Sequence, residues 1–244
     1  MNALGPPQRE LLISHMRDAG TSLDVRVVVI SAVGRAFCAW GDLGLGARAA
    51  RPEGQPARVV GETGPGVRSA QALIAAVLDC PKPVIAAVNG VAAGMGAQLA
   101  LAADFVVAST KARFAELFVS RGIVPDAGAA YLLPRVLGLH LAKRLLLLGA
   151  DLPLDDAVRL GVVYRLVEPE ELGVVVAELA GQLADGPTIA LGLAKRLLNH
   201  SLDEDRGGAF DREELAVGMN VWTEDSAEGL RSFAEKRAPI FRGW

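Results

Sequence analysis

Residues 81–104, PKPVIAAVNGVAAGMGAQLALAAD, join two apolar runs through a glycine-rich loop. The first run, Pro83 to Val88, has the length and composition of a buried strand, and the second predicts a helix that continues to about Ala102. A strand that turns through glycines directly into a helix is a building unit of α/β folds. The only polar side chain on this predicted helix is Gln98, which carries no charge.

The rest of the core repeats this alternation. Strands are expected at residues 25–30, 105–108 and 162–167, a short segment at 113–118, and helices at 11–19, 67–80, 127–133, 139–148 and 153–160. Residues 41–66 are rich in glycine, proline and arginine and have no periodicity, which is typical of a surface loop that lines a site. The alternation predicts an α/β fold with parallel strand pairing.

After Pro169 the pattern changes to helices alone, expected at residues 170–184, 187–199, 212–222 and 226–237. These helices follow the last strand, so they cannot all cover the sheet, and some are expected to pack on a neighbouring subunit. We therefore divide the chain into a core of residues 1–185 and a C-terminal helical region of residues 186–244, and we expect a homo-oligomer.

The composition of the 244 residues is that of a soluble globular protein, with 51% hydrophobic and 22% charged residues and a net charge of −3. A chain without a basic surplus lacks the face that binds a phosphate backbone, so no nucleic acid partner is expected. Residues 84–109 are apolar, but Asn89, Gln98 and Asp104 interrupt them, so no membrane span is expected either.

The cysteines and histidines argue against several kinds of site. Cys38 and Cys80 have no metal-ligand spacing, and two cysteines suit a reducing compartment better than a disulfide framework. None of the three histidines lies near a nucleophile motif, so a serine or cysteine hydrolase triad is poorly supported. The N-terminus has no basic stretch followed by an apolar block, so we expect no secretory signal and a cytoplasmic protein.

Two glycine-containing loops follow neighbouring strands of the predicted sheet. One is GRAFCAWGDLG at residues 34–44, and the other is Gly94-Met95-Gly96. Backbone N–H groups at a helix N-terminus have no acceptor within the helix and favour an oxygen that gains negative charge. Two such loops can direct two N–H donors at one carbonyl oxygen and form an oxyanion hole. The alternative is that the glycines serve only close packing of helix and strand.

Five stretches, spread in order over the whole chain, together resemble the crotonase family, also called the enoyl-CoA hydratase and isomerase family. They are NAL (2–4), GRAFCAWGDL (34–43), PKPVIAAVNGVAAGMGAQLALAAD (81–104), RFAELFVSRGIVPDAGAAYLLPRVLG (113–138) and SFAEKRAPIF (232–241). No single stretch is decisive, but the ordered set is highly specific. The resemblance implies a core of β-β-α units wound as a spiral. It also implies C-terminal helices that build a homotrimer or a dimer of trimers.

In this family two backbone N–H groups stabilise the enolate of an acyl-CoA thioester, which implies the N–H groups of Gly41 and Met95 here. CoA would lie against the first loop and meet the last helix, of the same or a neighbouring subunit, at its nucleotide end. The implied substrate-binding residues are Cys38, Ala39, Trp40, Asp42, Leu43, Gly94, Gln98, Leu117, Phe118, Phe233 and Lys236. For Lys236 a solvated helix end is the alternative. No metal or redox cofactor is implied, since coenzyme A is part of the substrate.

The sequence departs from the family's hydratases at both acid-base positions. Hydratases use two glutamates to hold and activate the water that adds to the double bond, and this chain has Gln98 and Phe118 in their places. An amide and a phenyl ring supply neither a base nor an acid. Efficient hydration is therefore not expected.

Asp126 lies in a segment that resembles the branch of the family that shifts double bonds, the isomerase of phenylacetate degradation in particular. One base suffices for allylic isomerisation, because it can remove a proton from C2 or C4 and return it at the other end of the dienolate. Burial in an apolar pocket shaped by Leu117 and Phe118 would raise the pKa of Asp126. The alternative role is a helix N-cap. Glu116, two residues from Phe118, is expected to face the opposite way as a surface or structural residue.

Two further features depart from the family. Trp40 stands where the family nearly always has glycine, and the chain begins at the NAL stretch, where relatives have a further pair of strands. The prediction is an enoyl-CoA isomerase of the crotonase type. A non-catalytic acyl-CoA-binding protein is one alternative, and another reaction of the family, such as hydration, thioester hydrolysis or decarboxylation, is the other.

Overall fold

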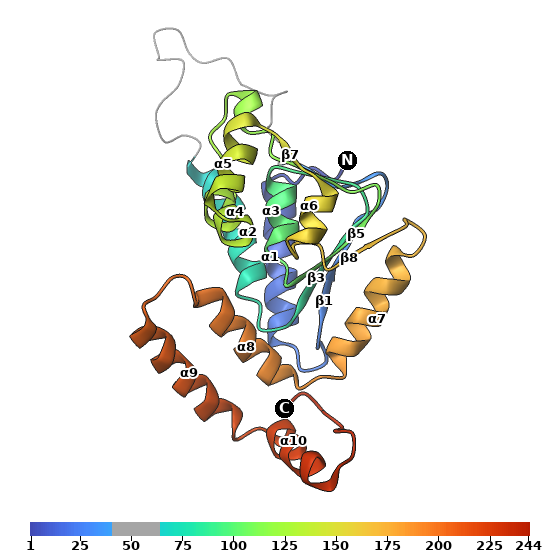
Figure 1. Ribbon diagram of the computed structural model, residues 1–244, viewed down its shortest axis with the longest axis vertical. Helices are drawn as coiled ribbons and strands as arrows, with labels where there is room; N and C mark the ends of the chain where they lie inside the picture. The colour runs from blue at the N-terminus through green and yellow to red at the C-terminus, as the bar shows by residue number, and fades with distance from the viewer. Residues whose placement is uncertain (41–63) are drawn as a thin grey trace.

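The computed structural model describes residues 1–40 and 64–244, which form two four-stranded sheets and the helices around them (Figure 1). The first sheet is entirely parallel, in the order β1 (Val28–Ile30), β3 (Val84–Val88), β5 (Phe105–Ser109) and β8 (Arg165–Val167). The second has the order β2 (Ala36–Ala39), β4 (Val91–Ala93), β6 (Arg113–Ala115) and β7 (Asp151–Leu152), and β7 is antiparallel to β6. The predicted α/β fold is confirmed.

Three successive units give one strand to each sheet before the chain enters a helix. The strands β1 and β2 precede α2 (Gly64–Leu78), and β3 and β4 precede α3 (Met95–Leu101). The strands β5 and β6 precede a 3-10 turn, η1 (Val119–Arg121), and α4 (Ala129–Leu137). This order is the β-β-α repeat that the resemblance implies.

Two details differ from the sequence prediction. The strands β2, β4 and β7 were not predicted from periodicity, because runs of two to four residues hold too few alternating side chains to show a pattern. The helix α4 continues through Pro134 to Leu137, where the prediction ended it at Leu133. Pro134 removes the N–H that would bond to the carbonyl of Ala130, and Ala130 is exposed, so water can replace that bond.

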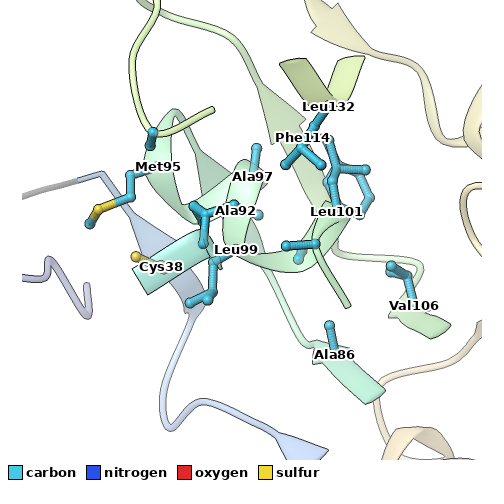
Figure 2. Packing of buried hydrophobic residues seen from close by; sticks show 14 of the residues in the cluster. Cys38, Ala86, Ala92, Met95, Ala97, Leu99, Leu101, Val106, Phe114 and Leu132 are labelled. Atoms are coloured by element: carbon cyan, nitrogen blue, oxygen red, sulfur yellow. The ribbon is translucent and has the colours of Figure 1, made fainter. Parts of the chain in front are cut away.

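The helix α3 lies at the centre of the core. All of its residues are buried, and Figure 2 shows its side chains among those of β2, β4, β6 and α4. A helix that is apolar all round is stable only when it is enclosed on every side. The predicted helix after the glycine loop is therefore the element around which the strands and α4 are packed.

The remaining core helices enclose these sheets. They are α1 (Pro6–Thr21), α5 (Leu139–Leu148), α6 (Leu154–Arg159) and α7 (Leu172–Ala184). The helix α7 covers the outer face of the first sheet, where Leu172 and Val176 pack on Ile85 and Val107. With both faces covered, the parallel strands read as continuous apolar runs.

The last three helices, α8 (Thr188–His200), α9 (Arg206–Asn220) and α10 (Glu224–Glu235), lie at the far end of the molecule from α5 (Figure 1). Buried Lys195 of α8 joins them to the core, because its Nζ pairs with Oδ2 of Asp104 at 2.8 Å. The same carboxylate oxygen accepts the N–H of Val84 at 2.7 Å, at the start of β3. The predicted boundary at residue 185 falls in the turn between α7 and α8.

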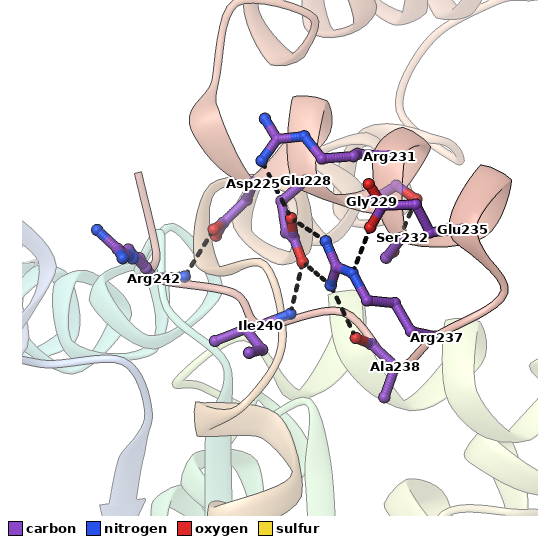
Figure 3. A network of polar contacts seen from close by, with 10 residues as sticks. All are labelled: Asp225, Glu228, Gly229, Arg231, Ser232, Glu235, Arg237, Ala238, Ile240 and Arg242. Carbon is purple, nitrogen blue, oxygen red and sulfur yellow. Dashed lines mark hydrogen bonds and ion pairs between the residues drawn. The ribbon is translucent and has the colours of Figure 1, made fainter.

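The chain after α10 folds back on that helix through carboxylates (Figure 3). The N–H groups of Arg242 and Gly243 donate to Asp225 at 2.6 and 2.7 Å, and that of Ile240 donates to Glu228 at 3.0 Å. The guanidinium of Arg237 also binds Glu228. These bonds hold the C-terminal tail against α10.

No single helix in the described parts of the chain is long and apolar enough to cross a bilayer; α7 and α8 reach that length only as a pair, which is bent by 104°.

Candidate active site

The N-terminal end of α3 forms the first part of the candidate site. The strand β4 ends at Ala93, Gly94 has a φ of 50°, and α3 begins at Met95. The N–H of Gly94 donates to the carbonyl of Ala115 on β6 at 2.9 Å, which fixes the turn. As the first residue of the helix, Met95 has no acceptor for its N–H within the helix. This geometry suits the predicted role of the Met95 N–H as a donor to an anionic oxygen.

The glycines of this loop serve two purposes. A Cβ atom on Gly96 would lie 2.0 Å from the carbonyl oxygen of Cys38, so only glycine lets α3 approach β2 this closely. Gly94 instead adopts the positive φ that turns the strand into the helix. The close-packing alternative explains Gly96, whereas Gly94 shapes the turn that presents the Met95 N–H.

The indole of Trp40 lies against this turn. A Cβ atom on Gly94 would be 2.7 Å from Cε3 of Trp40, and the indole also packs on the ring of Phe118 with the centroids 4.9 Å apart. Trp40 has a φ of 81°, a left-handed conformation that favours glycine. Trp40 and Phe118 thus form an apolar wall beside the Gly94 turn.

The second predicted oxyanion donor, Gly41, lies outside the described residues, as do Asp42 and Leu43. The strand that leads to them is described up to Trp40, and Ala39 pairs with Ala93 at the end of β4. The strand β2 therefore ends beside the end of β4, directly before the Gly94 turn.

The carboxyl of Asp126 is half-buried in the turn before α4, and it does not cap that helix. The N-cap is Gly128, and no side chain caps the helix. The N-cap alternative for Asp126 is therefore wrong. Ala127 has a φ of 48°, a left-handed conformation that costs about 1 to 2 kcal/mol for a residue with a Cβ atom. Such strain is concentrated at functional sites.

Two opposing influences act on the pKa of Asp126. Burial raises it above its ordinary value, which is the direction predicted, and the positive charge of Arg9 on α1 opposes this rise. Arg9 is itself buried, and its Nη1 donates to the carbonyl of Gly66 at 3.1 Å. The positive charge of Arg9 favours the ionised form of the carboxyl, which is the form that accepts a proton.

The sequence analysis missed Arg9, although a signal was present. Arg9, Leu12, Ile13 and Met16 have the spacing of one face of a helix, and the last three are buried or half-buried apolar residues. An arginine in an apolar stripe predicts a buried charge with a specific partner.

Gln98 and Glu116 form a buried polar pair beside α3. The Nε2 of Gln98 donates to Oε1 of Glu116 at 2.8 Å, and neither side chain is more than 1% exposed. Glu116 was expected to be a surface or structural residue. It does not lie on the surface. The strand β6 ends at Ala115, so the alternation assumed for Glu116 does not extend to it. Burial raises the pKa of Glu116 to about 7.

The other predicted substrate-binding residues are placed in two regions. Leu117 is half-buried next to Phe118, and Cys38 is buried, where burial raises the pKa of its thiol to about 11. Phe233 on α10 and Lys236 directly after it are exposed, and the helix α10 lies far from α3 in Figure 1. The chain does not bring these two residues to its own Met95, and their contact with CoA stays a prediction.

Known proteins of one family are similar to this chain in sequence and in fold. The model of the enoyl-CoA hydratase/isomerase family matches residues 1–243. A 1,2-epoxyphenylacetyl-CoA isomerase of Escherichia coli is 38% identical, over 90% of this chain and 82% of the relative. A crotonyl-CoA hydratase of Syntrophomonas wolfei is 39% identical, over 66% and 62%. The crystal structure of an enoyl-CoA hydratase from Bacillus anthracis, 30% identical, has a TM-score of 0.86, with 99% of this chain and 91% of that one covered.

Proposed function

Because the chain belongs to the enoyl-CoA hydratase/isomerase family, we propose that it is an isomerase that moves the double bond of an enoyl-CoA thioester. The carboxylate of Asp126 removes a proton from C2 or C4 of the acyl chain, and the thioester becomes a dienolate. The N–H groups of Met95 and Gly41 hold the dienolate oxygen. The carboxyl of Asp126 then returns the proton at the other end, so neither water nor a redox cofactor is consumed.

The observation that carries this proposal is the environment of the Asp126 carboxyl. Its carboxyl is half-buried, is not used as a cap, and sits in a strained turn at the start of α4. The residues that flank this turn, Ala127 and Ala129, belong to the same buried cluster as Met95. A base with a raised pKa beside the cluster that contains the oxyanion donor supports proton transfer next to a thioester.

Isomerisation is favoured over hydration by the two positions where hydratases have glutamates. Gln98 is a neutral amide whose Nε2 is already bonded to Glu116, and Phe118 is fully buried against Trp40. Neither side chain transfers a proton. Relatives of this chain carry isomerase and hydratase names alike, so the choice rests on these residues.

The test is to incubate the pure protein separately with a 3-enoyl-CoA and a 2-enoyl-CoA and to identify the products. We expect a shift of the double bond in the wild type and a loss of about a hundredfold or more in Asp126→Asn, since a general base contributes that much. Asp126→Asn should still bind the thioester, as measured by calorimetry. If Asp126→Asn keeps full activity, Asp126 is not the base.

Trp40 motivates a second candidate, a protein that binds acyl-CoA without converting it. Its indole covers Gly94 and narrows the approach to the Met95 N–H. In that case the wild type binds acyl-CoA but converts no thioester that is offered. Trp40→Gly, which also suits the positive φ at this position, would then create activity, whereas an active wild type excludes this candidate.

The same family membership supports a homotrimer or a dimer of trimers. The segment from α9 to α10 carries large apolar side chains that are almost fully exposed, among them Trp222 (89%) in the turn between the two helices and Phe233 (85%) on α10. A neighbouring subunit that covers them would also bring Phe233 and Lys236 to the CoA of another chain. Sedimentation analysis tests this, and a monomeric active enzyme would contradict it.

A further inference from the structure

Two oxygen atoms of the Gln98–Glu116 pair have no hydrogen-bond partner in the described parts of the chain. They are Oε1 of Gln98 and Oε2 of Glu116. Both side chains are almost wholly buried, at 0% and 1% exposure. A buried polar atom without a partner costs free energy, and native proteins nearly always supply one from protein, water or ligand. The pair is therefore a built polar site with two oxygen atoms that can take part in further hydrogen bonds.

The position of the pair ties it to the candidate active site. Gln98 lies three residues after Met95 on α3, and helical side chains lean towards the helix N-terminus, so its amide reaches back towards the Gly94 turn. Glu116 follows Ala115, whose carbonyl holds the N–H of Gly94. Phe118 of the apolar wall is two residues further on. The two residues of the pair thus follow closely, along the chain, the two residues that form the oxyanion turn and hold it in place.

The hydrogen-bonding capacity of the pair defines its occupant. An ionised Glu116 can only accept, so it binds the amide nitrogen of Gln98 and leaves the amide oxygen facing away from the carboxyl. What remains is an amide acceptor and a carboxyl oxygen that accepts when ionised and donates when protonated. A hydroxyl group both donates and accepts, so it suits either state of Glu116.

We propose that Gln98 and Glu116 form a hydroxyl-binding subsite of the acyl pocket, with Glu116 as a positioning residue that orients the amide of Gln98. A water molecule occupies the subsite in the resting protein, and the hydroxyl of a hydroxylated acyl thioester displaces it. The binding of a hydroxylated acyl thioester rests on the proposed function, because it takes an acyl-CoA as the ligand. The role is separate from that of Asp126, which moves the proton.

Calorimetry with a hydroxyacyl-CoA and the saturated acyl-CoA of the same length tests the subsite. We expect the wild type to bind the hydroxylated ligand about tenfold more tightly, as one hydrogen bond to a buried polar group allows. Gln98→Leu and Glu116→Leu should lose this preference and keep the affinity for the saturated ligand, whereas Glu116→Gln, which can still bond to the amide, should keep most of it. Ser120→Ala, on the neighbouring turn η1, is the matched control and should change neither affinity.

A crystal structure of the free protein separates the subsite from the proposed function. We expect an ordered water within hydrogen-bond distance of Gln98 Oε1 or Glu116 Oε2. If no CoA thioester binds but this water is present, the enzyme proposal fails and the hydroxyl site stands. If the water is absent, or if Gln98→Leu and Glu116→Leu both bind the two ligands as the wild type does, the subsite is refuted.

Discussion

Two glutamates, one in the core and one in the C-terminal region, have carboxyl groups whose pKa values are shifted in opposite directions. Glu116 is enclosed in the core and bonded to a neutral amide, and burial raises its pKa to about 7. Glu228 on α10 is bonded to the guanidinium of Arg237 and to the N–H of Ile240, and these bonds lower its pKa to about 2 (Figure 3). The pKa of a glutamate side chain is thus close to 7 in the core and far below 7 in the C-terminal region.

This difference in pKa distinguishes the candidate site in the core from the C-terminal region, where the carboxylates have a structural role. The C-terminal region compensates each charge locally, as Glu228 and Asp225 do when they hold the tail. Among the described residues, the core around α3 gives Glu116 no counter-ion and opposes the rise in the pKa of Asp126 with the charge of Arg9 alone. Groups whose pKa is moved towards neutrality are concentrated where protons are transferred, which supports the proposal that the chemistry takes place in the core around α3.

The largest expected effect comes from removing the uncompensated carboxyl, in Glu116→Gln. The pKa of Glu116 is raised in the folded protein, so its contribution to stability is complete below pH 4.5 and is lost as the pH rises through about 7. The raised pKa of about 7, against an ordinary 4.5, corresponds to about 3 kcal/mol. Urea unfolding of both proteins should therefore show Glu116→Gln gaining about that much on the wild type between pH 4.5 and 7.5. A difference that does not change with pH would show that Glu116 is compensated.

A smaller effect is expected from Arg9→Met, which removes the charge opposite Asp126. The pKa of Asp126 should rise further, because only the effect of burial remains, and the acidic limb of kcat/KM against pH should move to higher pH. Loss of the bond to Gly66 should cost about 1 kcal/mol of stability. Arg9→Lys keeps the charge and is the matched control. If the limb stays in place in Arg9→Met, Arg9 does not act on the base.

The smallest effect is expected at the compensated end, in Glu228→Gln. The pKa of Glu228 is lowered, so its stabilising contribution is present above pH 4.5 and is lost as the pH falls towards 2. Thermal unfolding should show a slightly lower midpoint than the wild type at pH 7 and a difference that shrinks in acid, with kcat unchanged. Glu213→Gln, at an exposed position on α9, serves as the control. A loss of activity in Glu228→Gln would place this network in the site.

Most helices could be predicted from the sequence, because their apolar stripes repeat over several turns. The helix α5 has the predicted bounds, and α3 begins at the glycine turn as expected. The second sheet could not be predicted from periodicity, since each of its strands has two to four residues. Its existence followed only from the family resemblance, through the β-β-α repeat.

The candidate site was predicted in part, and the misses have physical causes. The turn at Met95 and the raised pKa of Asp126 agree with the prediction. Glu116 was misplaced because strand alternation was assumed beyond Ala115, where β6 ends. Arg9 was missed because its partner is distant in the sequence, and only the folded chain brings α1 close to the turn before α4.

The central claim is that Asp126 moves a proton of a bound enoyl-CoA, and deuterium exchange in D2O measures this most directly. Wild type incubated with a 2-enoyl-CoA or 3-enoyl-CoA should incorporate deuterium at C2 and C4, as followed by mass spectrometry and NMR. Asp126→Asn should bind the same thioester and incorporate deuterium at a rate lower by about a hundredfold or more. Exchange in Asp126→Asn at the wild-type rate would contradict the account.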